Sequence, residues 1–196
     1  MQLETLLNEV PEYAKDLRLN IGNVLRQPEL TPAQAWGTAV ACAIAVRNPR
    51  LAAALEAEAL PHLGEQGLFA ARAAAAVMGM NNIFYRFRHL SSNAKYAEMP
   101  ARLRMQVIGK HGADPVSFEL WCLAVSSVNG CGLCVDAHEQ VFVVWHRQQV
   151  LKQISIKGLH KTLLPFEQFA TLMCQQALSE QRRLLQAQQE AATTVL

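Results

Sequence analysis

The sequence predicts an all-α protein, a helical bundle with two similar lobes. Apolar residues recur three and four positions apart along most of the chain, and few alternating β-branched segments precede Arg88. A helix–break–helix pattern also repeats at an offset of 81 residues, which aligns residues 35–58 with residues 116–139. With 196 residues, 51% of them hydrophobic, the chain is long enough to bury one sizeable core. We therefore expect a single domain over residues 1–196 that contains an internal pseudo-repeat.

The boundaries of the expected helices follow from capping residues, prolines and glycines. Residues 31–34, with the sequence TPAQ, form a capping box with proline at the first helical position, and Asn48-Pro49 ends one helix and begins the next. Asp114 is expected to cap the helix that Pro115 begins. Helices are expected over residues 3–10, 13–25, 32–46, 51–60, 68–88, 102–108, from 115 to a break at 129–130, from 131 to about 149 and from 165 onward. Turns are expected at residues 61–67, 91–100 and 158, and a fraying tail at 181–196.

Charge and hydropathy exclude several classes of function. The formal net charge is only +2 and the basic residues are scattered, so no nucleic-acid partner is expected. The longest uncharged apolar stretch, residues 35–46, is too short to cross a bilayer. The N-terminal segment carries acidic residues early and lacks the pattern of a signal peptide, so we expect a cytoplasmic protein without a membrane partner.

Two cysteines three residues apart, Cys131 and Cys134, dominate the chemistry of the sequence. An odd total of five cysteines argues against a secreted disulfide framework. Asn129 and Gly130 break the preceding helix, so Cys131 should lie in the first turn of a new helix, where the macrodipole favours a thiolate. His138 follows Cys134 by four residues and should share its helix face. A carboxylate that precedes the break, Glu119, could orient that histidine.

Interpretations of the same residues that involve no catalysis also remain open. The two thiols could be buried by chance, or Cys131, Cys134 and His138 could bind zinc with Glu119 as the fourth ligand. Glu119 could equally be a solvated carboxylate near a helix N-terminus. We retain no metal site, because a second ligand pair is absent from the sequence. The other cysteines are interpreted as small buried hydrophobes and the other histidines as solvated or core-edge residues: Cys42, Cys122 and Cys174, and His62, His89, His111, His146 and His160.

Several short motifs give the chain an extensive resemblance to the alkylhydroperoxidase D family, within the wider carboxymuconolactone decarboxylase-like group. The resemblance covers roughly residues 6–139 and weakens after about Val144. The motifs that carry it are PEYAKD at 11–16, WGT at 36–38, RNP at 47–49, MGMNN at 78–82 with FYR at 84–86, FELW at 118–121, and NGC at 129–131 continuing to His138-Glu139.

The resemblance implies a specific activity. The fold would be all-helical with two similar lobes in a homotrimer, and the protein would be a thiol peroxidase that reduces alkyl hydroperoxides and re-reduces a partner peroxiredoxin, alkylhydroperoxidase C. It implies no tightly bound cofactor: reducing power would come from the lipoyl group, as dihydrolipoamide, of a lipoylated acyltransferase. By the same likeness, Cys134 would attack peroxide, Cys131 would condense with the resulting sulfenic acid, and Glu119 and His138 match proton-relay residues.

One residue departs from the family pattern. Better-known members have a histidine immediately before the second cysteine, whereas this chain has Leu133, which can neither carry a proton nor stabilise a thiolate. We therefore expect weaker intrinsic peroxidase activity than in a histidine-containing relative. The alternatives are a CxxC electron-transfer adaptor or a metal-stabilised helical module without turnover. Decarboxylase-like chemistry is less well supported, because it would leave the CxxC pair without a role.

Overall fold

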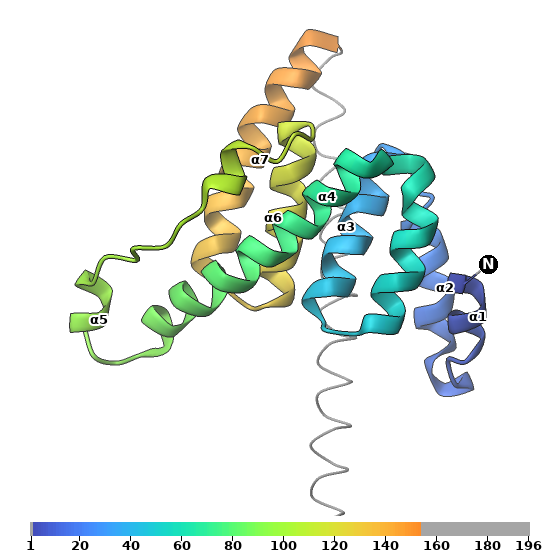
Figure 1. Ribbon diagram of the computed structural model, residues 1–196, viewed down its shortest axis with the longest axis horizontal. Coiled ribbons are helices and arrows are strands. Elements are labelled where there is room, and N and C mark those ends of the chain that lie inside the picture. The colour runs from blue at the N-terminus through green and yellow to red at the C-terminus, as the bar shows by residue number, and fades with distance from the viewer. Residues whose placement is uncertain (1, 154–196) are drawn as a thin grey trace, which may run out of the picture.

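The computed structural model describes residues 2–153 of the chain, with side chains through residue 145. The described part is built from helices alone, which confirms the all-α fold (Figure 1). The predicted turn at Gly158, helix from Pro165 and tail at 181–196 lie outside the described residues. The elements are α1 (Gln2–Asn8), η1 (Glu12–Ala14), α2 (Lys15–Val24), α3 (Pro32–Ala45), α4 (Pro49–Leu90), α5 (Lys95–Glu98), η2 (Gln106–Gly109), α6 (Pro115–Val128) and α7 (Gly132–Gln153).

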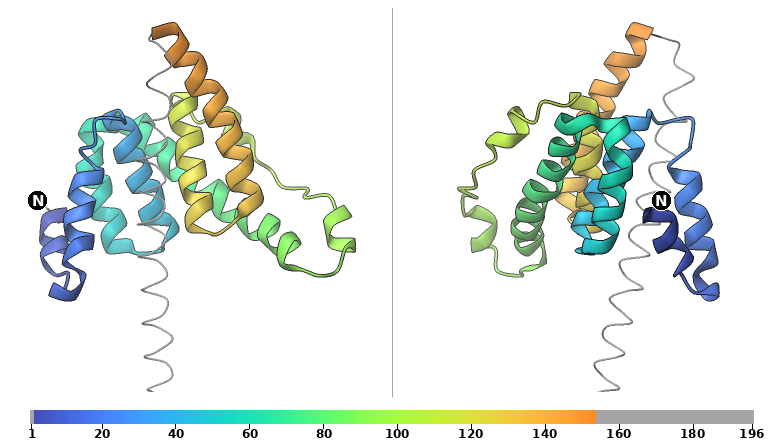
Figure 2. Two further views of the ribbon diagram at one scale, coloured as in Figure 1. Left: turned by 180° about the vertical axis from the view of Figure 1, so that it is seen from behind. Right: turned by 45° about the vertical axis from the view of Figure 1, so that its right-hand side comes forward.

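Helices α3 and α6 pack together at the centre of the molecule, each beside the helix that follows it in the chain. The first part of α4 lies beside α3, α7 lies beside α6, and the second part of α4 crosses both pairs (Figures 1 and 2). Helices α1 and α2 lie at one side, whereas α5 belongs to an arm that projects from the other. The core consists mainly of buried side chains from α3, α4 and α6.

Local capping chemistry defines where the central helices begin, as the sequence predicts. The Thr31 hydroxyl accepts the Gln34 N–H at 3.2 Å, and the Gln34 side chain accepts the Thr31 N–H at 3.0 Å. Asn48 caps α4 through the Leu51 N–H, and Asp114 caps α6 through the Ser117 N–H. Each cap satisfies a backbone donor that lacks a partner within its helix, and proline follows each cap.

The turn predicted over residues 61–67 is much shorter in the structure. Helical backbone continues past Pro61, and only Gly64 leaves it, with φ 61° and ψ 176°. This backbone conformation is open to glycine because it has no Cβ. The axis of α4 changes direction at Gly64, so one residue provides the corner that brings the second part of α4 across α3 and α6 (Figure 1).

The helix predicted over residues 102–108 is wrong for its first half. Arg102 has a left-handed φ of 50°, which prevents a right-handed helix from starting there, and only the short 3-10 helix η2 forms. Residues 91–114 therefore connect α4 with α6 through an extended arm that contains α5.

The contact between α3 and α6 depends on one glycine. A Cβ on Gly37 would lie 2.2 Å from the Trp121 indole, so only glycine lets that ring lie against α3. The indole N–H of Trp121 donates to the Gln34 carbonyl at 3.2 Å. This close contact fixes α6, which carries Glu119, against the core. None of the helices in the described range is both long enough and apolar enough to span a membrane.

Candidate redox active site

A disulfide joins Cys131 and Cys134 at the N-terminus of α7. Gly130 takes a positive φ of 65° immediately before it, and the Cys131 N–H donates back to the Ser126 carbonyl at 3.0 Å. The Cys131 carbonyl accepts the N–H groups of Cys134 and Val135. Cys131 is therefore the N-cap residue of α7, whereas the sequence predicts it in the first turn, one position further along. The helix dipole still favours negative charge on both sulfurs.

Both cysteines of the disulfide are buried, although the segment between them is not. Cys131 is 1% exposed and Cys134 is 5% exposed, whereas the intervening Leu133 is 57% exposed. Water is therefore largely excluded from the sulfur atoms, and an apolar side chain stands at the surface beside them.

Glu119, which is buried, and His138, which is partly buried, form a pair that joins α6 to α7. The Glu119 Oε2 lies 2.7 Å from the His138 Nδ1, and the two side chains are 8% and 15% exposed. The prediction that Glu119 is buried and orients the histidine agrees with this geometry, and the solvated alternative is wrong. Because His138 follows Cys134 by one helical turn, the imidazole lies on the same helix as the disulfide, and Glu119 contacts it from α6.

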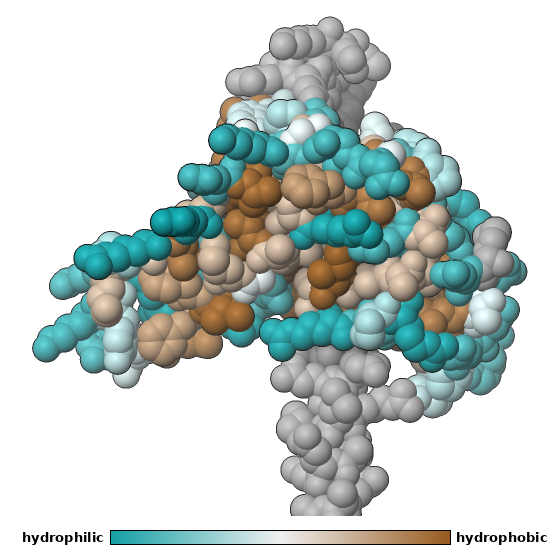
Figure 3. Space-filling model, viewed as in Figure 1, coloured by the Kyte–Doolittle hydropathy of each residue, from teal (hydrophilic) through white to brown (hydrophobic). Residues whose placement is uncertain are grey.

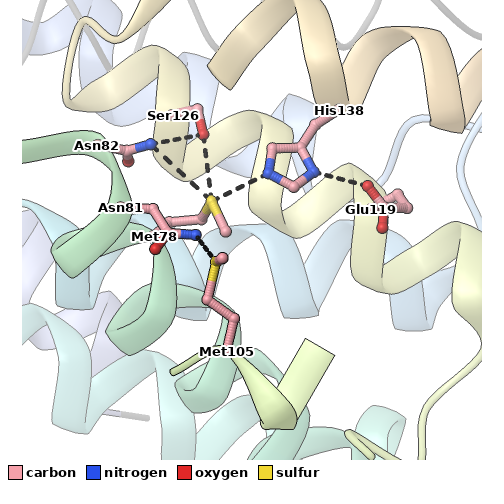
Figure 4. Close-up of polar contacts among 7 residues, drawn as sticks. All are labelled: Met78, Asn81, Asn82, Met105, Glu119, Ser126 and His138. Atoms are coloured by element: carbon pink, nitrogen blue, oxygen red, sulfur yellow. Dashed lines mark hydrogen bonds and ion pairs between the residues drawn. The ribbon is translucent and has the colours of Figure 1, made fainter. Parts of the chain in front are cut away.

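A polar cluster that sequence reasoning missed lies on the other side of the imidazole (Figure 4). The His138 Nε2 lies 3.1 Å from the Met78 sulfur, which also accepts from Ser126 Oγ at 3.5 Å and Asn82 Nδ2 at 3.9 Å. Asn82 also donates to Ser126 Oγ at 3.0 Å and accepts from Asn129 Nδ2 at 2.9 Å. Asn82 is fully buried, and the sequence signal that pointed to this segment is the MGMNN motif at 78–82, which contains both Met78 and Asn82.

The cluster continues to the surface at Arg86. Its guanidinium donates to the carbonyl of Asn129, two residues before the first cysteine of the disulfide. A continuous set of polar contacts therefore runs from Arg86 through the cluster to the Glu119–His138 pair.

Two of the remaining cysteines are buried, and one of the remaining histidines lies at the edge of the core. Cys122 is buried, and desolvation, followed by the nearby Glu119 charge, raises the pKa of its thiol well above the ordinary value, so it stays protonated. Cys42 is also buried, as predicted, and Cys174 lies outside the described residues. His111 is a core-edge residue whose ring stacks on Phe118 with centroids 3.9 Å apart.

The zinc alternative finds no ligand set in the part of the chain that the structure describes. No three His, Cys, Asp or Glu side chains there are grouped as metal ligands would be. The two sulfurs that zinc would require are bonded to each other. The arrangement can instead support thiol–disulfide exchange beside a carboxylate–imidazole pair.

Comparison with known proteins agrees with this chemistry. Residues 94–143 match the model of the carboxymuconolactone decarboxylase family. The chain is 74% identical to the alkyl hydroperoxide reductase AhpD of Solibacter usitatus over 141 residues, which are 72% of this chain and 80% of that protein. It is 61% identical to the AhpD of Acidobacterium capsulatum over 142 residues, or 72% and 78% of the two chains. With the AhpD of Rhodospirillum centenum the identity is 56% over 140 residues, or 71% and 75%. The resemblance seen in the sequence is thereby confirmed, and the chain belongs to the AhpD family of carboxymuconolactone decarboxylase-like proteins.

Proposed function

We propose that this protein reduces alkyl hydroperoxides through a dithiol–disulfide cycle of Cys131 and Cys134. The observation that carries the proposal is the Cys131–Cys134 disulfide at a helix N-terminus, one turn from His138, which pairs with the buried Glu119. The names of the relatives support a hydroperoxide as the oxidant, since they are alkyl hydroperoxide reductases.

The chemistry divides into two displacements. The Cys134 thiolate attacks the terminal oxygen of the hydroperoxide, an S–O bond forms as the O–O bond breaks, and the alkoxide leaves as an alcohol after it takes a proton. The Cys131 thiolate then attacks the Cys134 sulfur, an S–S bond forms, and the hydroxyl of the sulfenic acid leaves as water. His138, held by Glu119, is the group assigned to proton transfer in both steps.

We assign the return of electrons to a lipoyl group. One thiolate of dihydrolipoamide on a lipoylated acyltransferase attacks the disulfide, and its second thiol closes to lipoamide while both cysteines are released reduced. The reduced CxxC pair would also reduce the disulfide of a partner peroxiredoxin, alkylhydroperoxidase C. No tightly bound cofactor is required, because the reductant arrives and leaves in each cycle.

Location and assembly complete the proposal. A cycle that begins with a reduced dithiol suits the cytoplasm, where thiols are kept reduced. The family resemblance implies a homotrimer, and association of copies is supported by large apolar side chains that are exposed along the second part of α4: Phe69, Met80, Ile83, Phe87 and Leu90. Apolar side chains gather on the face that α4 crosses (Figure 3), and burial between copies would remove them from water. Sedimentation equilibrium should give three times the mass of one chain.

The proposed cycle is tested by a variant of each cysteine of the disulfide and by one matched control. Cys134→Ala should abolish turnover of cumene hydroperoxide with dihydrolipoamide, because the thiol assigned to attack the hydroperoxide is removed. Cys122→Ala also removes one buried thiol, but should retain activity. Cys131→Ala should stop at a sulfenic acid on Cys134, detected by mass analysis after one equivalent of hydroperoxide. Full turnover by Cys134→Ala would contradict the mechanism.

A disulfide-exchange adaptor is the second candidate, and Leu133 is the observation that favours it. An exposed leucine beside the thiols supplies neither proton nor charge for peroxide cleavage, although exchange with another disulfide requires neither. An adaptor would be reduced rapidly by dihydrolipoamide and would pass electrons to a peroxiredoxin, but would turn over free hydroperoxide at a negligible rate.

A further inference from the structure

The Met78 side chain lies where three polar groups from three helices converge. Met78 is fully buried on α4, and its sulfur is 3.1 Å from His138 Nε2 on α7 and 3.5 Å from Ser126 Oγ on α6. The third group is Asn82 Nδ2, one turn along α4, at 3.9 Å. Figure 4 shows the imidazole held between this sulfur and Glu119.

The chemistry of a thioether determines which atom carries the hydrogen. Methionine sulfur can only accept, so a ring nitrogen in hydrogen-bond contact with it must be a donor. At the opposite edge of the ring, Nδ1 faces a Glu119 oxygen at 2.7 Å. The contact between Nε2 and the Met78 sulfur is a hydrogen bond when Nε2 carries a hydrogen, whichever atom of the Nδ1–carboxylate pair holds the shared proton.

We propose that Met78 is a positioning residue for His138, and that its thioether accepts the Nε2–H and fixes the tautomer and plane of the imidazole. This inference rests on the proposed function, in which His138 transfers protons. Sulfur is a weak acceptor. It holds the ring in place, but releases the Nε2 hydrogen to a departing alkoxide or a thiolate more readily than a carboxylate would.

Simple packing does not explain the contact. A methionine that only filled space could be replaced by leucine with little effect, because leucine has similar volume. Leucine at position 78 would instead leave the partly buried Nε2–H and the buried Ser126 hydroxyl without this acceptor. The imidazole would then lose one of the two contacts that define its orientation.

Met78→Leu tests the proposal against Met105→Leu as a matched control. Met105 also accepts a hydrogen bond through its thioether, from Asn81 Nδ2 of α4 at 3.0 Å. In the oxidised wild-type protein, nitrogen NMR should show a protonated, slowly exchanging Nε2 on His138. Met78→Leu should lose the slow exchange, shift the acid limb of the kcat/KM profile against pH and lower kcat by roughly tenfold or more. Met105→Leu should change none of these, and Met78→Gln, which restores an acceptor, should recover the slow exchange.

Two results would overturn the assignment. One is an unprotonated Nε2 on His138 in the wild-type protein, a measurement that does not depend on any variant folding. The other is a folded Met78→Leu variant with the wild-type NMR signal and pH profile, which would make Met78 a packing residue. If the protein turned over no hydroperoxide, the proposed function would fail, but the NMR comparison would still decide the role of Met78.

Discussion

At the scale of single residues, Leu133 is the position that most directly limits the proposed chemistry. Leu133 is 57% exposed and lies between the two cysteines, at the position where the family pattern has a histidine. Leu133→His should raise the thiolate fraction at neutral pH, measured by ultraviolet absorbance of the reduced protein, and should raise hydroperoxide turnover by about tenfold or more. Leu19→His, at a leucine of similar exposure (53%) on α2, is the control. An unchanged turnover in Leu133→His would show that Glu119 and His138 suffice.

The sequence revealed those site residues whose partners lie within a helical turn or whose chemistry is unusual. The spacing of Cys131, Cys134 and His138 depends only on helix geometry, and a carboxylate beside apolar residues is conspicuous. Met78 could not be found in this way, because methionine at helical spacing usually fills a core. Its contact with His138 spans 60 residues of sequence and depends on how α4 crosses α7.

At the scale of helices, boundaries set by neighbouring residues were predictable and those set by packing were not. Thr31, Asn48 and Asp114 each cap a helix through an N–H three residues later, so the signal is local. The backbone at Gly64 depends on how two parts of α4 pack on the rest of the molecule. Helical propensity predicts a helix from residue 102, but the left-handed Arg102 overrides it.

Two glycine variants test how tightly the helices pack. Gly37→Ala would place a Cβ 2.2 Å from Trp121 and should lower the free energy of unfolding by about 1–3 kcal/mol or more, because α3 and α6 must separate. Gly79→Ala, in the interior of α4, should instead raise it by about 0.5–1 kcal/mol, because the added Cβ would meet nothing within 4 Å beyond the adjoining residues and backbone of its own helix. Urea denaturation measures both values. A stable Gly37→Ala variant would contradict the close contact.

At the scale of the whole molecule, the two related segments differ in what they do. Residues 35–58 and 116–139 each fold as a helix, a short break and a second helix, but common ancestry of the two stays a prediction. In the first segment Ala53 and Ala57 stand where the second has Cys134 and His138. Glu58 in the first segment accepts the Leu3 N–H at 3.0 Å and so holds α1 to α4. One segment supports the fold, and the other carries the disulfide.

Global stability should depend on pH through His111, which lies where the arm meets α6. Desolvation lowers the pKa of His111, and the nearby charges of Glu119 and Asp114 oppose this only in part. Its Nδ1 also accepts the Ala113 N–H at 3.1 Å, a hydrogen bond that protonation of that nitrogen would break. The folded protein therefore resists a proton that the unfolded chain accepts at about pH 6.5. The free energy of unfolding should consequently fall as the pH drops through that value, and this contribution should level off below the folded pKa.

His111→Phe isolates this effect, because phenylalanine keeps a ring that can stack on Phe118 but cannot be protonated. Urea midpoints at pH 7.5 and pH 5.5 give the loss of stability for each protein. The loss should be smaller for His111→Phe than for the wild type, whereas His89→Phe, which removes an exposed imidazole at the end of α4, serves as the control. The carboxylates are common to all three proteins, so their contributions cancel in the comparison. An equal loss of stability in His111→Phe and the wild type would contradict a role for His111 and would place the pH dependence elsewhere in the molecule.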